Sequence, residues 1–171
     1  NNKVEYTYDA LGNPLTYKTA RGNTYTYAYD GNGNLKTETD PLNGVVTYNY
    51  NEYDTATSFK DANNNNTAYE YDLLNRLVSE TSATGSSDSY EYDALSRLTK
   101  YVNKRGQSIN YVYDAEGKMT GRRTVEDVVL YTYDANGNLL TIEDKNGTIA
   151  RTYDNLNRVK SYTNANNQTI G

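Results

Sequence analysis

The chain has 171 residues, of which 20 are tyrosine and one is phenylalanine, and it has no tryptophan, histidine or cysteine. Its formal net charge of −5 argues against nucleic acid and anionic membrane surfaces as partners, because both attract basic proteins. No apolar run is long enough to cross a membrane and no stretch has the pattern of a signal peptide. Disulfides are excluded, but the absence of cysteine does not fix the compartment.

Hydrophobic residues make up only 36% of the chain, yet 12% of it is aromatic and the aromatics are periodic, which favours an ordered, polar β-protein over disorder. The two ends lie in turn-like stretches, Asn1-Asn2-Lys3 and Asn166-Asn167-Gln168. We therefore expect residues 1–171 to be one repeat array that is an excerpt of a larger protein.

A Tyr-Asp dipeptide recurs in register along the whole chain, at steps of 21, 21, 21, 21, 21, 20 and 20 residues. Recurrence at such a period is typical of a repeat protein in which each repeat is one supersecondary unit. We number each repeat from its motif tyrosine, position 0. The motif residues, to which we assign a structural role, are Tyr8-Asp9, Tyr29-Asp30, Tyr50-Asn51 (where asparagine replaces the aspartate), Tyr71-Asp72, Tyr92-Asp93, Tyr113-Asp114, Tyr133-Asp134 and Tyr153-Asp154.

The residues before each motif alternate with a period of two. Position −2 is tyrosine in seven repeats and Arg151 in the eighth, position −4 is mostly apolar, and the positions between are mostly polar or small. This alternation, rich in Tyr, Val, Ile and Thr, predicts a half-buried strand over 4–8, 25–29 and the matching residues of each repeat.

A tight turn is predicted directly after each strand. Aspartate opens it, and position +4 is Gly, Asn or Asp in seven of eight repeats, residues that tolerate positive φ. This favours a type I turn closed by a bulge, with the aspartate accepting from backbone amides inside it. A two-residue primed turn at Asn136-Gly137 is the alternative and would shift the pairing by one residue.

The bulged turn pairs position 0 with position +6, which is Leu, Met or Val in six repeats. A second turn follows at about position +14, and the sixth repeat is one residue short there. Eight hairpins predict an all-β antiparallel meander of roughly sixteen strands, which twist should make curl, spiral or close. Tyrosines gather on one face, which we expect to line a concavity or to press against another part of the larger protein.

Position +9 carries a separate pattern, which we assign to the opposite face. Its residues alternate between apolar and charged through the first seven repeats. They are Tyr17, Glu38, Phe59, Glu80, Tyr101, Arg122, Ile142 and Tyr162. In the first repeat Pro14 displaces the leucine to position 15. The sequence therefore does not decide on which face of the sheet Tyr17 lies. If the pattern is more than coincidence, Phe59, Tyr101 and Tyr162 are candidate surface-docking aromatics.

The recurring Tyr-x-Tyr-Asp-x-x-Gly-Asn/Arg-Leu, as in 133–139 and 71–77, closely resembles the YD-repeat or Rhs-repeat family over essentially the whole chain. That resemblance implies a spiralling β-sheet shell. In bacterial Rhs and wall-associated toxins and the toxin-complex C component it encloses a C-terminal toxic domain, and in teneurins it forms an extracellular barrel. It implies a secreted or cell-surface location, a bacterial source, and the rest of the parent polypeptide, including toxin cargo, as partner. The self-cleaving segment and toxin domain of the family are not seen here.

No catalytic, metal or cofactor site is predicted. Histidine and cysteine are absent, and the carboxylates recur at turn and surface positions. Asp30-Gly31-Asn32-Gly33-Asn34 lacks the later ligands of a calcium loop. We expect a structural module rather than an enzyme. The alternatives are a module that binds glycans through exposed tyrosines, or a self-assembling subunit joined to further copies through strand edges.

Overall fold

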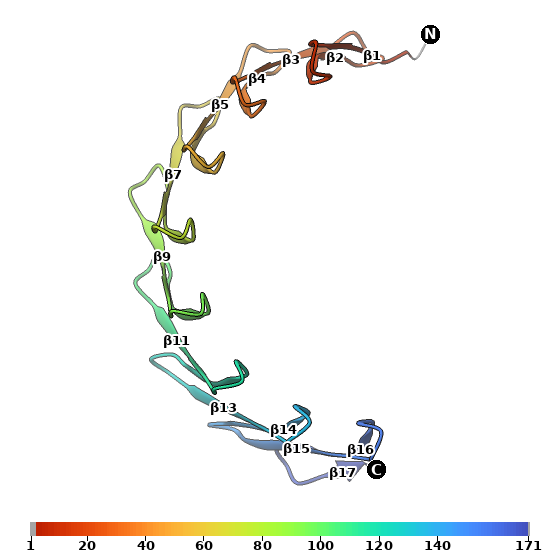
Figure 1. Ribbon diagram of the computed structural model, residues 1–171, viewed down its shortest axis with the longest axis vertical. Coiled ribbons are helices and arrows are strands. Elements are labelled where there is room, and N and C mark those ends of the chain that lie inside the picture. The colour runs from red at the N-terminus through yellow and green to blue at the C-terminus, as the bar shows by residue number, and fades with distance from the viewer. Residues whose placement is uncertain (1–2, 171) are drawn as a thin grey trace. The chain divides into compact units, whose positions relative to one another are not determined.

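The computed structural model describes residues 3–170. Strands and turns make up this part of the chain, and it contains no helix that could cross a membrane. The strands form one 17-stranded antiparallel sheet, in which each strand pairs with the next along the chain (Figure 1). The predicted all-β array of tandem hairpins is therefore confirmed.

The strands of the sheet follow in chain order. They are β1 (Glu5–Tyr8), β2 (Pro14–Lys18), β3 (Thr24–Tyr29), β4 (Leu35–Thr39), β5 (Val45–Tyr50), β6 (Ala56–Lys60), β7 (Asn66–Tyr71), β8 (Leu77–Thr81), β9 (Ser87–Tyr92), β10 (Leu98–Val102), β11 (Ser108–Tyr113), β12 (Met119–Arg123), β13 (Val128–Tyr133), β14 (Leu139–Asp144), β15 (Gly147–Tyr153), β16 (Val159–Thr163) and β17 (Thr169–Ile170).

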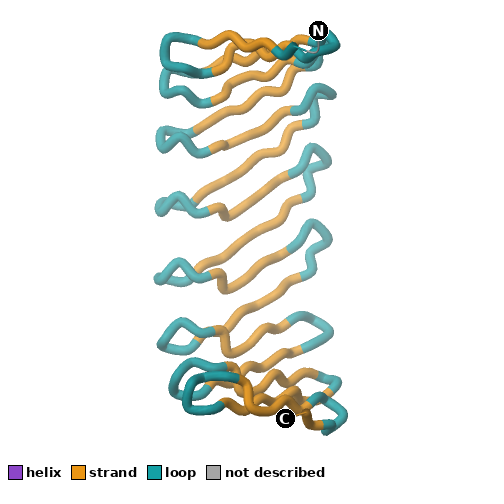
Figure 2. The backbone as a smooth tube through the Cα atoms, turned by 90° about the vertical axis from the view of Figure 1, so that its right-hand side faces the viewer, coloured by secondary structure: helices purple, strands orange, loops and turns teal. Residues whose placement is uncertain are grey.

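The chain divides into two units, residues 1–89 and 90–171, with the division inside β9. In each unit an odd-numbered strand leads into the Tyr-Asp turn and an even-numbered strand leads out of it, and the turns lie along the two margins of the sheet (Figure 2). The strand beyond the roughly sixteen predicted is β17, because Thr169 and Ile170 already begin the next hairpin.

Each Tyr-Asp hairpin has the bulged register that the sequence favours. In the second repeat Tyr29 lies opposite Leu35, while Ala28 lies opposite Thr37, so Lys36 is the extra residue. The first repeat keeps this register: Tyr8 lies opposite Pro14, and Leu15 takes the place of the extra residue.

The bulge also corrects one prediction. Position +9 does not lie on the face opposite the tyrosines, because the extra residue at +7 reverses the alternation of the outgoing strand. Tyr17 lies directly opposite Tyr6, and Phe59 directly opposite Tyr48. The same register places Tyr162 opposite Arg151.

Two faces follow from this register. The tyrosine face carries positions −4, −2, 0, +6 and +9. The second face carries positions −3, −1, +8 and +10, and it is rich in Thr and Ser, with hydroxyl pairs such as Thr132–Thr141 at 2.6 Å. Val129, 6% exposed, is the only buried apolar side chain in the described part of the chain. Strand ladders, turns and the tyrosines therefore provide the cohesion that a buried core usually provides.

Candidate functional site

The turn after each motif tyrosine is built around the aspartate side chain. The Oδ1 atom of Asp72 accepts hydrogen bonds from the amides of Leu74 and Arg76 at 2.9 and 3.0 Å, and Oδ2 accepts from the Arg76 Nε at 2.7 Å. The Arg76 side chain and then its backbone amide hold the pKa of this carboxyl below its ordinary value. Asn51 makes the same two backbone contacts at 2.9 and 3.0 Å, so an amide can replace the carboxylate in this role.

The turn conformation requires positive φ at position +4. Glycine supplies it in four repeats and Asp, Asn or Ser in the others, at Gly12, Gly33, Asp54, Asn75, Ser96, Gly117, Gly137 and Asn157. The alternative primed turn at Asn136-Gly137 is absent, because the Gly137 amide donates to the Asp134 carbonyl and the Asp134 amide to the Asn138 carbonyl, as in a bulged turn.

The second turn of several repeats uses the same chemistry, which the sequence reasoning missed. Asp40 and Asp61 each accept from the amides two and four residues later, at 2.7 to 2.9 Å. Asn103 and Asn164 accept in the same way at 2.9 to 3.0 Å. Small polar residues at position +11 were the signal that could have revealed it. The short sixth repeat closes instead with the Thr124 amide donating to the Asp127 carbonyl at 2.8 Å.

The motif tyrosines have a contact that alternation alone could not predict. Six of the hydroxyls donate to the carbonyl of the residue just before the bulge in the preceding repeat, at 2.8 to 3.0 Å, in the pairs Tyr29–Pro14, Tyr50–Leu35, Tyr71–Ala56, Tyr113–Leu98, Tyr133–Met119 and Tyr153–Leu139. The phenol therefore links consecutive hairpins at the point where the bulge disrupts the ladder. Burial raises the pKa of the Tyr29, Tyr50, Tyr71, Tyr113 and Tyr133 phenols.

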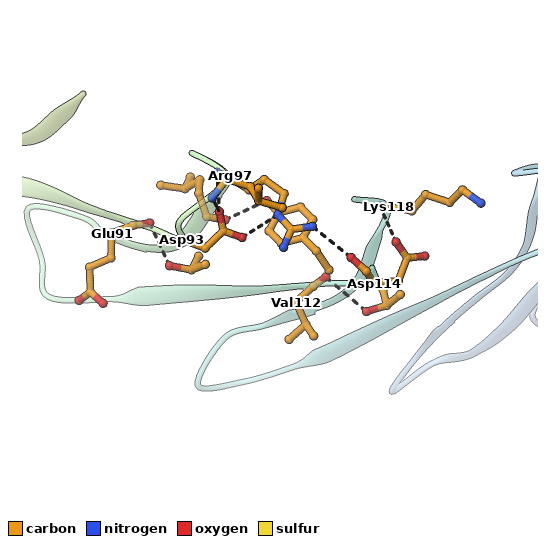
Figure 3. Close-up of polar contacts among 11 residues, drawn as sticks. Glu91, Asp93, Arg97, Val112, Asp114 and Lys118 are labelled. Atoms are coloured by element: carbon orange, nitrogen blue, oxygen red, sulfur yellow. Dashed lines mark hydrogen bonds and ion pairs between the residues drawn. The ribbon is translucent and has the colours of Figure 1, made fainter. Parts of the chain in front are cut away.

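Neighbouring turns are also joined to each other. Arg97 donates from Nε to the Asp93 carboxylate at 2.6 Å and from Nη1 to the Asp114 carbonyl of the next repeat at 3.1 Å (Figure 3). Its guanidinium lies 4.8 Å from the centre of the Tyr113 ring. Where position +4 is not glycine, its side chain can also link two neighbouring turns. Asp54 accepts hydrogen bonds from the Asn32 and Asn34 side chains of the preceding repeat at 2.8 and 2.6 Å.

The tyrosine face carries rows of rings that lie opposite one another across strands. Tyr6 and Tyr17 have centroids 4.9 Å apart, Tyr48 and Phe59 5.5 Å, and Tyr90 and Tyr101 5.4 Å. Of the candidate docking aromatics, Phe59 and Tyr101 are therefore already packed against a tyrosine. The third, Tyr162, lies 5.9 Å from the guanidinium carbon of Arg151.

No assembly of acidic residues within residues 3–170 has the form of a metal site. The chain instead offers a shallow pocket of ≈ 230 Å³ at the second-turn margin of residues 90–171. Tyr101, Ile109 and Val125 line it together with the polar side chains of Gln107 and Glu126. The short sixth repeat forms one wall of this pocket.

The Teneurin YD-shell family matches residues 1–130, and the RHS Repeat family matches residues 133–169. The chain belongs to the YD-shell family. No curated protein matches it.

Solved structures of similar fold contain toxin-complex proteins. A crystal structure of TcdB2-TccC3-Cdc42 superposes on this YD-shell array with a TM-score of 0.73 at 21% identity, covering 91% of this chain and 10% of that chain. A mutant of the Photorhabdus luminescens Tc holotoxin pore gives 0.71 at 20% identity, with the same coverage. The array spans about a tenth of the length of these chains, and at this identity the likeness shows the fold alone.

Proposed function

We propose that this YD-shell array is a stretch of wall in a larger β-shell, with its tyrosine face turned toward an enclosed effector or toxin domain of the parent polypeptide. The observation that carries this is the lack of cover on an aromatic face: fifteen motif-position tyrosines share it, yet Val129 is the only buried apolar side chain among residues 3–170. Extended aromatic surface of this kind is typical of an interaction face.

The first and last strands of the described sheet each have a second edge that could pair. Within residues 3–170, β1 pairs along one edge with β2, and β17 pairs along one edge with β16. Their outer edges can accept further hairpins of the same repeat, which would remove the exposed edges. Pairing between separate copies is the competing use of these edges. Size-exclusion chromatography with light scattering tests it, and a monodisperse monomer would count against it.

Secretion or presentation at a bacterial cell surface, and a structural rather than catalytic role, complete the proposal. The likeness to Tc toxin structures and the two family matches support both. The array then contributes a wall and no turnover.

Thiol accessibility in the intact parent polypeptide tests the enclosure. The array has no native cysteine, so each single-cysteine variant adds one thiol to it, and its labelling is read on the peptide that carries that position. Thr67→Cys places a thiol on the tyrosine face opposite Phe59, and Ser58→Cys places one on the second face opposite Asn49. We expect a bulky maleimide polymer to label position 58 readily and position 67 many-fold more slowly, while a small maleimide labels both. Equal labelling by the polymer would contradict enclosure behind the tyrosine face.

A second candidate, glycan binding, is favoured by the pocket around Tyr101. An aromatic ring beside amide and carboxylate groups suits a sugar, which offers an apolar face and hydroxyls. We expect glycan-array binding to be lost in Tyr101→Ala and kept in Tyr162→Ala, which lies outside the pocket. Absence of binding by the unmodified chain would remove this candidate.

A further inference from the structure

Three tyrosines lie directly opposite one another on three adjacent strands in residues 3–89. Tyr6 on β1 lies opposite Tyr17 on β2, and Tyr17 lies opposite Tyr25 on β3. Their centroids are 4.9 and 5.9 Å apart, and the rings are stacked with interplanar angles of 26° and 25°. Tyr8 extends the group, with its centroid 6.2 Å from that of Tyr6.

This cluster is also where an oxidant can reach phenols. Tyr6 and Tyr8 are 50% and 57% exposed, so their rings meet solvent while Tyr6 remains stacked on Tyr17. The chain has no tryptophan and no cysteine, and Met119, its single methionine, lies in the other unit. The side chains that usually compete for oxidising equivalents are therefore missing from this unit.

We propose that the Tyr6–Tyr17 pair is an oxidative cross-linking site, at which a peroxidase with hydrogen peroxide joins the two phenols into dityrosine. Each phenol gives up one electron and one proton. The two radicals form a carbon–carbon bond between ring positions next to the oxygens, and the hydrogens on those carbons move to the oxygens as the rings regain aromaticity. The peroxide takes up the two electrons and two protons and becomes two waters.

Register and exposure together make this pair the preferred one. Directly opposed residues hold their Cβ atoms about 5 Å apart, so two phenols there can meet without backbone movement. Tyr53 is a useful contrast, because it is 67% exposed but makes no ring contact among residues 3–170. The bond would staple β1 to β2 covalently in a chain that cannot form disulfides. The peroxidase needs an open tyrosine face, so under the proposed shell function the bond forms before that face is enclosed.

Peptide mapping after peroxidase treatment of the dilute full chain tests the proposal. Cleavage before Asp9 and after Lys18 and Arg21 puts Tyr6, Tyr17 and Tyr25 on separate peptides. We expect dityrosine fluorescence in the monomer band and a dominant cross-link between the peptides of Tyr6 and Tyr17. A yield at Tyr53 equal to that at Tyr6, or coupling confined to dimers, would overturn the proposal.

Two matched variants separate register from exposure. Tyr17→Phe should abolish the Tyr6 cross-link while keeping the fold, because Phe59 already occupies the same place opposite Tyr48, at 5.5 Å. Phe59→Tyr should create a new cross-link between positions 48 and 59. Unchanged dityrosine yield in Tyr17→Phe, or no coupling at position 59 in Phe59→Tyr, would contradict the claim that the cross-strand register directs the reaction.

Discussion

The Tyr50 hydroxyl donates a hydrogen bond to the Leu35 carbonyl at 2.9 Å, across the boundary between two consecutive repeats. Leu35 is the residue just before the bulge of the second repeat, and Tyr50 is the motif tyrosine of the third. The motif tyrosine, which recurs in every repeat, thus bonds to the neighbouring hairpin at the point where the bulge interrupts its backbone hydrogen bonds. This relationship explains why the motif needs a phenol rather than any large apolar ring.

Replacing one motif tyrosine tests the energetic value of that bond. Tyr50→Phe keeps the ring and removes the donor, so we expect the free energy of unfolding to fall by about 1 kcal/mol. Tyr8→Phe is the control, because the Tyr8 hydroxyl makes no hydrogen bond within residues 3–170 and its side chain is 57% exposed. Urea unfolding of both variants measures the difference, and equal losses would argue against the assigned role.

Alkaline pH should destabilise the fold. Burial raises the pKa of Tyr29, Tyr50, Tyr71 and Tyr133 above the ordinary 10.0. The unfolded chain therefore loses these protons before the folded chain does. Their contribution to stability is complete below pH 10.0 and is lost as the pH rises through the folded pKa values. Thermal unfolding followed against pH, with phenolate absorbance recorded alongside, should show both changes together above pH 10.0, and a flat profile there would contradict this.

The aspartate of the turn should act mainly through its hydrogen bonds to backbone amides. Asp72→Ala removes the acceptor for Leu74 and Arg76, whereas Asp72→Asn keeps an oxygen in the place that Asn51 uses in the third repeat. We expect the Ala variant to lower the unfolding temperature clearly and the Asn variant to lower it much less. Thermal unfolding monitored by circular dichroism ranks the two, and an Asn variant as damaged as the Ala variant would instead point to the ion pair with Arg76.

Acid titration provides the control for Asp72→Asn. The Asp72 carboxyl has a pKa below its ordinary 3.8, mainly because the Arg76 side chain bonds to it. Its contribution is present above pH 3.8 and is lost as the pH falls through the folded pKa. The acid-induced loss of stability should therefore be smaller in Asp72→Asn than in the unmodified chain.

Alanine substitutions at two glycines of one turn distinguish the cost of backbone strain from the cost of fitting a Cβ atom. Gly33 has φ +89 and Gly31 does not lie in the left-handed region, while a Cβ at either site has room. Gly33→Ala should cost about 1 kcal/mol because an L-residue is strained at that φ. Gly31→Ala should leave stability unchanged within roughly 0.5 kcal/mol. Urea unfolding of the pair measures this, and equal effects would contradict the turn assignment.

The sequence predicted the hairpin array, the bulged turn and the Tyr29–Leu35 pairing, because alternation and turn chemistry are local signals. It misplaced Phe59 and its equivalents, because one extra residue at the bulge reverses every side chain that follows it. It also missed the Tyr50–Leu35 bond, which joins residues of different repeats and leaves no mark on periodicity. Local patterns therefore revealed each hairpin, while the contacts between hairpins required the structure.

Hydrogen exchange in Tyr50→Phe tests most directly the claim that motif hydroxyls hold consecutive hairpins together. We predict faster amide exchange in β4 and β5, which flank the lost bond, with the exchange of β1 and β2 unchanged. Exchange that stays the same everywhere, or that rises equally across residues 3–89, would contradict the claim.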